Sequence, residues 1–434
     1  MRTSGVDYLL RGGRIVDPAN CVDEIGDLRL AAGLIAGFGP ELPADDCEVV
    51  DCAGMLVLPG LVDTNVHLNE PGREDRETIA TGTRAAARGG YTSLGCRSTV
   101  TMVMDNQTVV QFIRSRAARD GVVRVYPIGA MTKQMDGLEP AEIGELAAAG
   151  ALAVSDDIRP VANPAVMRRV IIYARMFNTP VISFPQDPEL AADGVMHEGP
   201  VSTRLGLEGI PAVAEEVFVA REAVFAEALD YPVHLSPISS AAAVELLRYA
   251  AERHIPLSAE VTPHNLVLTD EACRGYDTDA KVSPPLRSAA DRDALVAALA
   301  EGIIGVVATD HSPCTSAEKQ TEFQRAAFGI SGLETAFPLL FTELVLTNRL
   351  PLNRLVEAMS RRPAAVLGLA LGALTQGYPA DVAVVDPKAE RAVDTAAFHS
   401  KGRNNPFQGR QLRGWPRDVF VGGRAVLRDG ELTV

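Results

Sequence analysis

The 434-residue chain is predicted to be an α/β protein, a (β/α)8 TIM barrel with a small β-sandwich domain formed by both termini. Three observations predict this fold. Short apolar runs separated by Gly, Asp and Pro occupy both ends of the chain, which is typical of β structure. Strand-like and helix-like segments alternate through the middle. The count of eight strands, most of them followed by a helix, favours a closed barrel over an open sheet.

The two ends of the chain are expected to fold together. The segment VDYLLRGGRIV (6–16) and the segment RDVFVGGRAVL (417–427) have the same strand–turn–strand pattern. We therefore predict one discontinuous β-domain, residues 1–56 plus 370–434, and a barrel over residues 57–369. Two unrelated β-ribbons are the alternative interpretation.

The middle of the chain supplies the barrel. Its helical patterns cover residues 76–90, 140–150, 163–177, 211–229, 240–253 and 291–302, and several of them end in Gly. Its apolar strand candidates end near Asp63, Cys96, Ile128, Ser155, Phe184, Ser236, Glu260 and Thr309. In barrels of this kind the chemistry lies at the carboxyl ends of the strands, so functional residues are expected there.

Composition excludes several classes of protein. The chain has 41 basic and 56 acidic residues and a net charge of −15, which argues against nucleic-acid binding. The sequence contains neither an apolar run long enough for a membrane span nor an N-terminal signal-peptide pattern, so a cytoplasmic protein is expected. Six scattered cysteines without a CxxC pair indicate reduced thiols rather than a disulfide framework.

The strand ends carry the candidate chemistry. Asp63, Asn65 and His67 alternate after the first strand, so their side chains should point the same way, as in a metal site with one histidine missing. A structural, hydrogen-bonded histidine is the alternative for His67. Asp156 and Asp157 follow the fourth strand and could also be helix caps. His234 is more typical of a satisfied core histidine, and the eighth strand ends in ATDH with Asp310.

Segments along essentially the whole chain, in order, resemble dihydroorotases of the amidohydrolase superfamily. They are PGLVDTNVHLNEPGREDRETIATGTRAAARGGYTS, YPIGAMTKQMDG, GALAVSDD, GLEGIP, EVTPHNLVLTDEA, KVSPPLRSAADRDAL, GVVATDHSP, EKQTEF, GISGLETAFPLL and SKGRNNPFQG. The resemblance implies the same barrel with a β-sandwich built from both termini.

The resemblance also implies a mechanism. Zinc lowers the pKa of a bound water, and the resulting hydroxide attacks the ring amide of dihydroorotate, while the reverse reaction closes carbamoyl aspartate. Asp310 corresponds to the residue that moves the proton. The metal positions that this chain retains are His67, Asp156 and Asp310, with Asn65 as a further oxygen donor. Asp157 is the less favoured match for Asp156.

The chain departs from the family pattern at the site itself. Three positions where the family has histidine ligands hold Asn65, Phe184 and Pro237. Phe and Pro have no donor atom for a metal, and an amide oxygen is a poor zinc ligand. The substrate-binding positions are also changed, so no confident substrate contact is predicted; the replacements are Asn69, Thr99, Ser283 and Cys314. Arg97 is an additional cation, interpreted as a solvated or salt-bridged surface residue or, alternatively, as partial compensation.

These losses lead to the main hypothesis. The chain resembles, in residues 194–211 (GVMHEGPVSTRLGLEGIP), an inactive dihydroorotase-like branch that assembles with aspartate carbamoyltransferase. We therefore expect a pseudoenzyme without a cofactor, a homo-oligomer that serves as a scaffold for aspartate carbamoyltransferase in pyrimidine biosynthesis. One alternative is a weak or mononuclear dihydroorotase with a single weakly bound zinc at His67, Asp156 and Asp310. The other is a hydrolase of a different cyclic amide.

Overall fold

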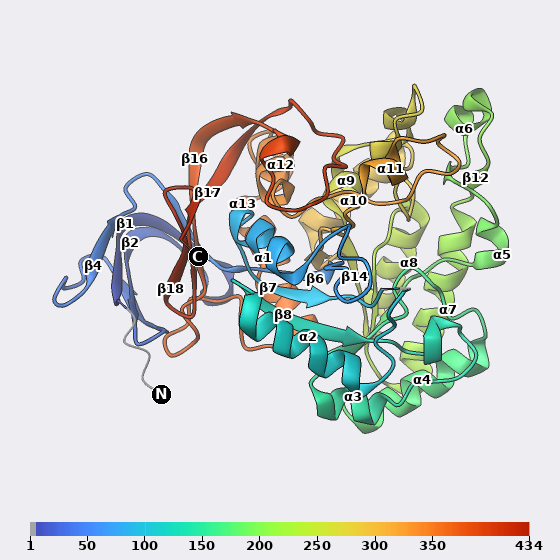
Figure 1. The fold of residues 1–434 in the computed structure, drawn as a ribbon, viewed down its shortest axis with the longest axis horizontal. Coiled ribbons are helices and arrows are strands. Elements are labelled where there is room, and N and C mark those ends of the chain that lie inside the picture. Colours follow the sequence, from blue (N-terminus) through green and yellow to red (C-terminus); the bar gives the residue numbers. More distant parts are fainter. Residues whose placement is uncertain (1–5, 100, 434) are drawn as a thin grey trace.

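The computed structural model describes residues 6–99 and 101–433, which form a parallel barrel and a β-sheet domain side by side (Figure 1). The barrel sheet has eight strands, each hydrogen-bonded to the next in chain order. An isolated parallel bridge between Val66 and His311 brings the ends of the first and last strands together. The barrel strands are β6 (Leu61–Val66), β7 (Tyr91–Cys96), β8 (Arg124–Gly129), β9 (Ala153–Val154), β10 (Val181–Ser183), β13 (Val233–Leu235), β14 (Leu257–Val261) and β15 (Val306–Val307). The predicted barrel is confirmed.

Helices cover the outside of the barrel (Figure 1). Each of the six predicted helical patterns contains or overlaps a helix, and Gly150 and Gly302 end two of them in the left-handed conformation. The 14-residue helix α2 was not predicted, because its sequence buries only three apolar side chains. The longer helices are α1 (Ile79–Arg88), α2 (Gln107–Asp120), α3 (Ile143–Ala149), α4 (Pro164–Met176), α7 (Val213–Leu229), α8 (Ala241–Glu252), α10 (Ala289–Glu301) and α13 (Leu352–Met359).

Shorter elements connect these parts. They are α5 (Pro188–Ala191), β11 (Met196–His197), α6 (Pro200–Leu205), β12 (Gly209–Ile210), α9 (Pro263–Val267), α11 (Ser316–Lys319), α12 (Ala336–Leu340) and α14 (Arg361–Val366). Among the described residues, no helix is both long and apolar enough to cross a membrane.

Both termini contribute to one nine-stranded sheet, as predicted. Strand β5 joins them, because it pairs in parallel with β1 and antiparallel with β16. The predicted domain boundary at residue 56 falls at the start of β5, which pairs within this sheet. The strands are β1 (Tyr8–Asp17), β2 (Val22–Ala31), β3 (Leu34–Gly39), β4 (Glu48–Asp51), β5 (Leu56–Pro59), β16 (Val382–Ala392), β17 (Gln411–Val421), β18 (Arg424–Arg428) and β19 (Glu431–Leu432).

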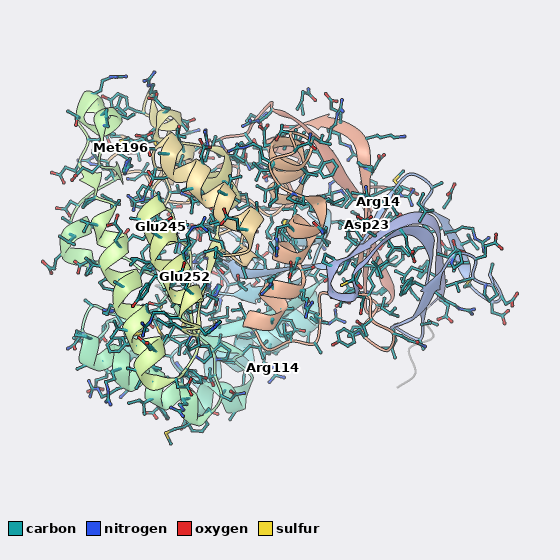
Figure 2. The ribbon with its side chains drawn as sticks, turned by 180° about the vertical axis from the view of Figure 1, so that it is seen from behind. Arg14, Asp23, Arg114, Met196, Glu245 and Glu252 are labelled. Carbon is teal, nitrogen blue, oxygen red and sulfur yellow. The ribbon has the colours of Figure 1, made fainter. Side chains whose placement is uncertain are left out.

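The sheet domain has its own apolar core, and an exposed ion pair lies outside that core. Leu10, Ile15 and Phe420 are completely or almost completely buried in this core. Outside the core, Arg14 of β1 and Asp23 of β2 lie next to each other (Figure 2), and the Arg14 Nε donates to Asp23 Oδ1 over 2.7 Å. This exposed pair contrasts with the buried charges of the barrel described below.

Candidate functional site

Asp63 connects the first and last barrel strands. Its carboxylate accepts the backbone N–H of Asn65 at 3.0 Å and the N–H of Thr309 at 3.1 Å. Burial raises the pKa of Asp63 to about 7, although these hydrogen bonds oppose the shift. Asp63 therefore closes the barrel and does not reach the cavity at its mouth.

His67 and Asp157 form a pair at the barrel mouth. The His67 Nε2 lies 2.9 Å from Asp157 Oδ2, and its Nδ1 lies 2.9 Å from the Oγ of Ser312. Burial alone would lower the pKa of His67, but the Asp157 carboxylate outweighs burial and raises that pKa. Burial likewise opposes ionisation of Asp157, yet the charge of His67 holds the pKa of Asp157 below its usual value. The two side chains therefore act as an ion pair.

Asp157, and not Asp156, faces this site. One oxygen of Asp156 accepts the backbone N–H groups of Met131 at 2.7 Å and Thr132 at 2.9 Å, and the other accepts the Thr132 hydroxyl. These bonds tie Asp156 to the segment that follows β8. Asp157 adopts a left-handed backbone conformation, φ 53°, next to His67. The sequence-based preference for Asp156 is thus corrected, because neighbouring residues at a strand end point in different directions.

Asp310 follows the eighth strand and faces the same cavity as His67 and Asp157. It is 5% exposed. Burial raises the pKa of Asp310 to about 8; the negative charge of Asp157 adds to the shift and the positive charge of His67 opposes it. Near neutral pH the carboxyl group is therefore able both to hold and to release a proton.

The cavity at the barrel mouth has a volume of about 160 Å³. It is lined by His67, Asp157 and Asp310 and by three of the four residues that replace the family's substrate-binding residues, Asn69, Thr99 and Ser283. The fourth, Cys314, lines a different hollow, with Lys319 and Arg403, and its buried thiol lies 3.5 Å from the carbonyl oxygen of Phe328. The sequence did not indicate this separation, because Cys314 is only four residues from Asp310.

Two arginines at the cavity were not predicted. Arg73 and Arg76 both line it, and both contact the carboxylate of Glu318, Arg73 at 2.8 Å and Arg76 Nε at 2.9 Å. Burial opposes ionisation of Glu318, but the two guanidinium groups lower its pKa to about 2. The only sequence signal was the charged segment GREDRE (72–77), which precedes the first barrel helix.

The predicted lost-ligand positions are all buried. Phe184 is 3% exposed and follows β10, while Pro237 follows β13. The Nδ2 of Asn65 lies within hydrogen-bonding distance of Glu260 Oε1 (3.3 Å) and Ser236 Oγ (3.4 Å). Its Oδ1 is buried and has no hydrogen-bond partner among the described residues.

Arg97 is not a surface residue. Its side chain is 2% exposed, and its guanidinium donates to Ser155 Oγ at 2.6 Å and Ser236 Oγ at 2.6 Å. It also lies 3.7 Å from the fully buried carboxylate of Glu260. His234, 3.0 Å from Glu260, completes the network as a satisfied core histidine. The expectation of a solvated or salt-bridged surface residue is wrong about the location of Arg97, because this residue directly after β7 is enclosed by Ser155, Ser236 and Glu260.

The two zinc ions implied by the resemblance do not fit this donor set. Phe184 and Pro237 offer no donor atom, and the Arg97 cation is buried among the neighbouring strand ends. Within residues 6–99 and 101–433, no three His, Cys, Asp or Glu side chains are grouped so that they could hold a metal ion. The metal positions predicted from sequence, His67, Asp156 and Asp310, therefore stay predictions, and of the two aspartates it is Asp157 that lies next to His67.

Curated relatives match nearly the whole chain. The Dihydro-orotase-like family matches residues 54–243. A protein of Pelotomaculum thermopropionicum named Dihydroorotase is 50% identical over 421 residues, 97% of this chain and 98% of that protein. A Dihydroorotase of Acetivibrio thermocellus is 44% identical over 97% of this chain and 99% of that protein.

Solved structures agree on the fold. An L-hydantoinase (dihydropyrimidinase) from Arthrobacter aurescens has a TM-score of 0.89 and 22% identity, covering 99% of this chain and 98% of that chain. A dihydropyrimidinase from Brevibacillus agri has a TM-score of 0.86 and 23% identity, covering 99% of this chain and 96% of that chain.

These relatives overturn two expectations drawn from the sequence. Proteins 44–50% identical over nearly the full length carry the name of an enzyme, so the preference for a chain without activity is wrong. The expectation that no cofactor is needed is wrong for the same reason, because the chemistry attached to that resemblance depends on zinc. Assignment to an inactive branch has no support among these matches. The chain belongs to the dihydroorotase-like family of the amidohydrolase superfamily.

Proposed function

We propose that the chain is a cyclic amidohydrolase of dihydroorotase type that interconverts dihydroorotate and carbamoyl aspartate in pyrimidine biosynthesis. Relatives of that name, 50% and 44% identical over 97% of the chain, support the reaction class. The observation that carries the proposal is Asp310, a buried carboxyl group with a pKa of about 8, in one cavity with the His67–Asp157 pair.

The reaction requires a group that both takes and gives a proton. Hydrolysis adds water across the ring C–N bond, so the attacking water loses a proton and the leaving nitrogen gains one. Ring closure reverses both transfers. A carboxyl group whose pKa lies near the working pH is suited to both directions. Asp310 meets this condition because burial raises the pKa of its carboxyl to about 8.

The cavity walls suit an anionic substrate. Carbamoyl aspartate carries two carboxylates, and the guanidinium groups of Arg73 and Arg76 line the cavity. Glu318 holds both arginines in place, so their position is fixed before a ligand arrives. Asn69 and Thr99 add hydrogen-bonding groups to the same walls. We assign these four residues to substrate binding within the proposal.

Turnover of purified protein, with and without added zinc and in both directions, tests the proposal. Asp310→Asn should lower the rate by about 10²–10⁴-fold, the usual contribution of a general acid–base group. Asp63→Asn is the matched control, since Asp63 is also a buried carboxyl group at the barrel rim but does not line the cavity. Its rate should stay close to that of the wild type.

Two outcomes would reject the proposal. One is a folded wild-type protein that turns over neither substrate with zinc present. The other is activity on hydantoin or dihydrouracil with dihydroorotate refused, which would identify a hydrolase of a different cyclic amide.

Assembly stays a proposal of its own. We propose a homo-oligomer and, as a partner, the catalytic subunit of aspartate carbamoyltransferase. Exposed apolar side chains on the neighbouring helices α4 and α7 support an association surface; Met176 is 72% and Val224 is 62% exposed. The mass of the protein in solution, measured alone and with the transferase, decides between these states.

A further inference from the structure

A permanent cation is buried among the strand ends of the barrel. The guanidinium of Arg97 stays charged under all physiological conditions. Besides the hydroxyls of Ser155 and Ser236, it donates from Nε to the carbonyl oxygen of Thr64 at 3.1 Å. Glu260, 0% exposed, supplies the opposite charge 3.7 Å away. Three strand ends and one buried carboxylate thus enclose Arg97.

The partners of Arg97 adjoin the positions at which metal ligands were expected. Ser236 directly precedes Pro237, and Ser155 precedes the Asp156–Asp157 pair. Asn65 shares two of these partners, because its Nδ2 also lies near Ser236 and Glu260. The cation is therefore inside the ring of strand ends where the resemblance would have placed two zinc ions.

We propose that Arg97 is a built-in cation that takes the place of one of those two ions, so that the chain binds at most one zinc ion. This inference concerns metal occupancy and does not depend on which cyclic amide is the substrate.

Two physical effects exclude a second ion. Phe184 and Pro237 provide no ligand atoms on their side of the barrel, as their chemistry dictates. A divalent ion there would also be repelled by a guanidinium with little water to screen it, since Arg97 is 2% exposed. Displacing the arginine would leave the Glu260 carboxylate buried with only His234 and neutral groups beside it.

Zinc binding to the purified full-length protein tests the proposal without an activity measurement. Zinc bound per chain is measured after equilibrium dialysis, and affinity is measured by competition with a chelating dye. His67→Gln, analysed in parallel, separates ions at the barrel mouth from ions on the exposed Cys21 thiol. Arg97→Gln removes the cation, and Arg97→Lys keeps a positive charge at the same position.

The wild type should bind no more than one zinc ion per chain, and any ion bound at the barrel mouth should be lost in His67→Gln. Arg97→Gln should bind zinc at least about tenfold more tightly than the wild type, while the zinc affinity of Arg97→Lys should resemble that of the wild type. Two His67-dependent zinc ions per wild-type chain would overturn the proposal, a result that remains available if Arg97→Gln does not fold. An Arg97→Gln protein that folds but binds zinc no more tightly would overturn it as well. A failed turnover assay alone leaves this inference standing and rejects the proposed function.

Discussion

Charged side chains on the two sides of the barrel mouth have different surroundings. On one side, His67, Asp157 and Asp310 line a cavity of about 160 Å³. On the other side, Arg97 and Glu260 are enclosed by hydroxyl groups and lie outside that cavity. Charges of the first kind are available to a ligand, whereas charges of the second kind satisfy one another.

The enclosed network explains how the barrel interior accommodates buried charges next to the cavity. A buried carboxylate such as Glu260 is costly in a low-dielectric interior unless it has charged or hydrogen-bonding partners. Arg97 and His234 supply such partners from the protein itself. The first side can then keep its proton-transfer groups, because the interior beneath it is electrostatically satisfied.

Removing the buried contact between Arg97 and Glu260 should change the stability of the protein most. Arg97→Gln removes one charged partner of the buried Glu260, leaving His234 beside it, and should lower the free energy of unfolding by about 3–5 kcal/mol. Urea denaturation at neutral pH measures it. Arg14→Gln, which removes the exposed pair with Asp23 (Figure 2), is the control and should cost no more than about 1 kcal/mol. Equal losses in the two variants would show that the Arg97 network contributes no more than a surface pair.

A smaller, pH-dependent effect on stability is expected from the His67–Asp157 pair, which lines the cavity. The folded pKa of His67 is raised, so its stabilising contribution is complete below its unfolded pKa of about 6.5 and is lost as pH rises through the folded pKa. The folded pKa of Asp157 is lowered, so its contribution is present above about pH 3.9 and is lost as pH falls through the folded value. The pair therefore stabilises most between about pH 4 and about pH 6.5.

We expect to see this pH dependence in the free energies of unfolding of the wild type and His67→Gln, measured from about pH 5 to about pH 9. The gap between the two proteins should be largest near the acidic end and should narrow as pH rises. His254→Gln, at an exposed histidine, is the control and should show a small, flat difference. A gap for His67→Gln that widens with pH would contradict the pairing.

The smallest effect is expected at Cys314, which lies outside the cavity. Cys314→Ser should cost about 1 kcal/mol of stability, because a buried thiol becomes a hydroxyl that can donate to the nearby carbonyls. Its kcat/KM should stay within about twofold of the wild type. Ser283→Ala, which alters the cavity wall, should lower kcat/KM further. A larger loss of kcat/KM in Cys314→Ser than in Ser283→Ala would place Cys314 at the substrate. It would also contradict the assignment of the two residues to separate hollows.

Local sequence patterns were enough to predict the architecture. Apolar period and turn residues are local properties, and they sufficed for the eight barrel strands, six of the helices and the joining of both termini into one sheet. Helix α2 was missed, because its apolar positions are too few to form a clear stripe. The sequence also located His67 and Asp310 at strand ends, since carboxyl ends of barrel strands converge.

The arrangement of the site depends on contacts between segments that are distant in the sequence. Whether Asp156 or Asp157 faces His67 depends on a left-handed residue and on two backbone N–H groups from another strand end. Whether Arg97 is solvated or enclosed depends on partners 58 and 139 residues away in sequence. Side-chain direction at a strand end and the partners of a buried charge are fixed by contacts between distant segments, and no local pattern encodes them.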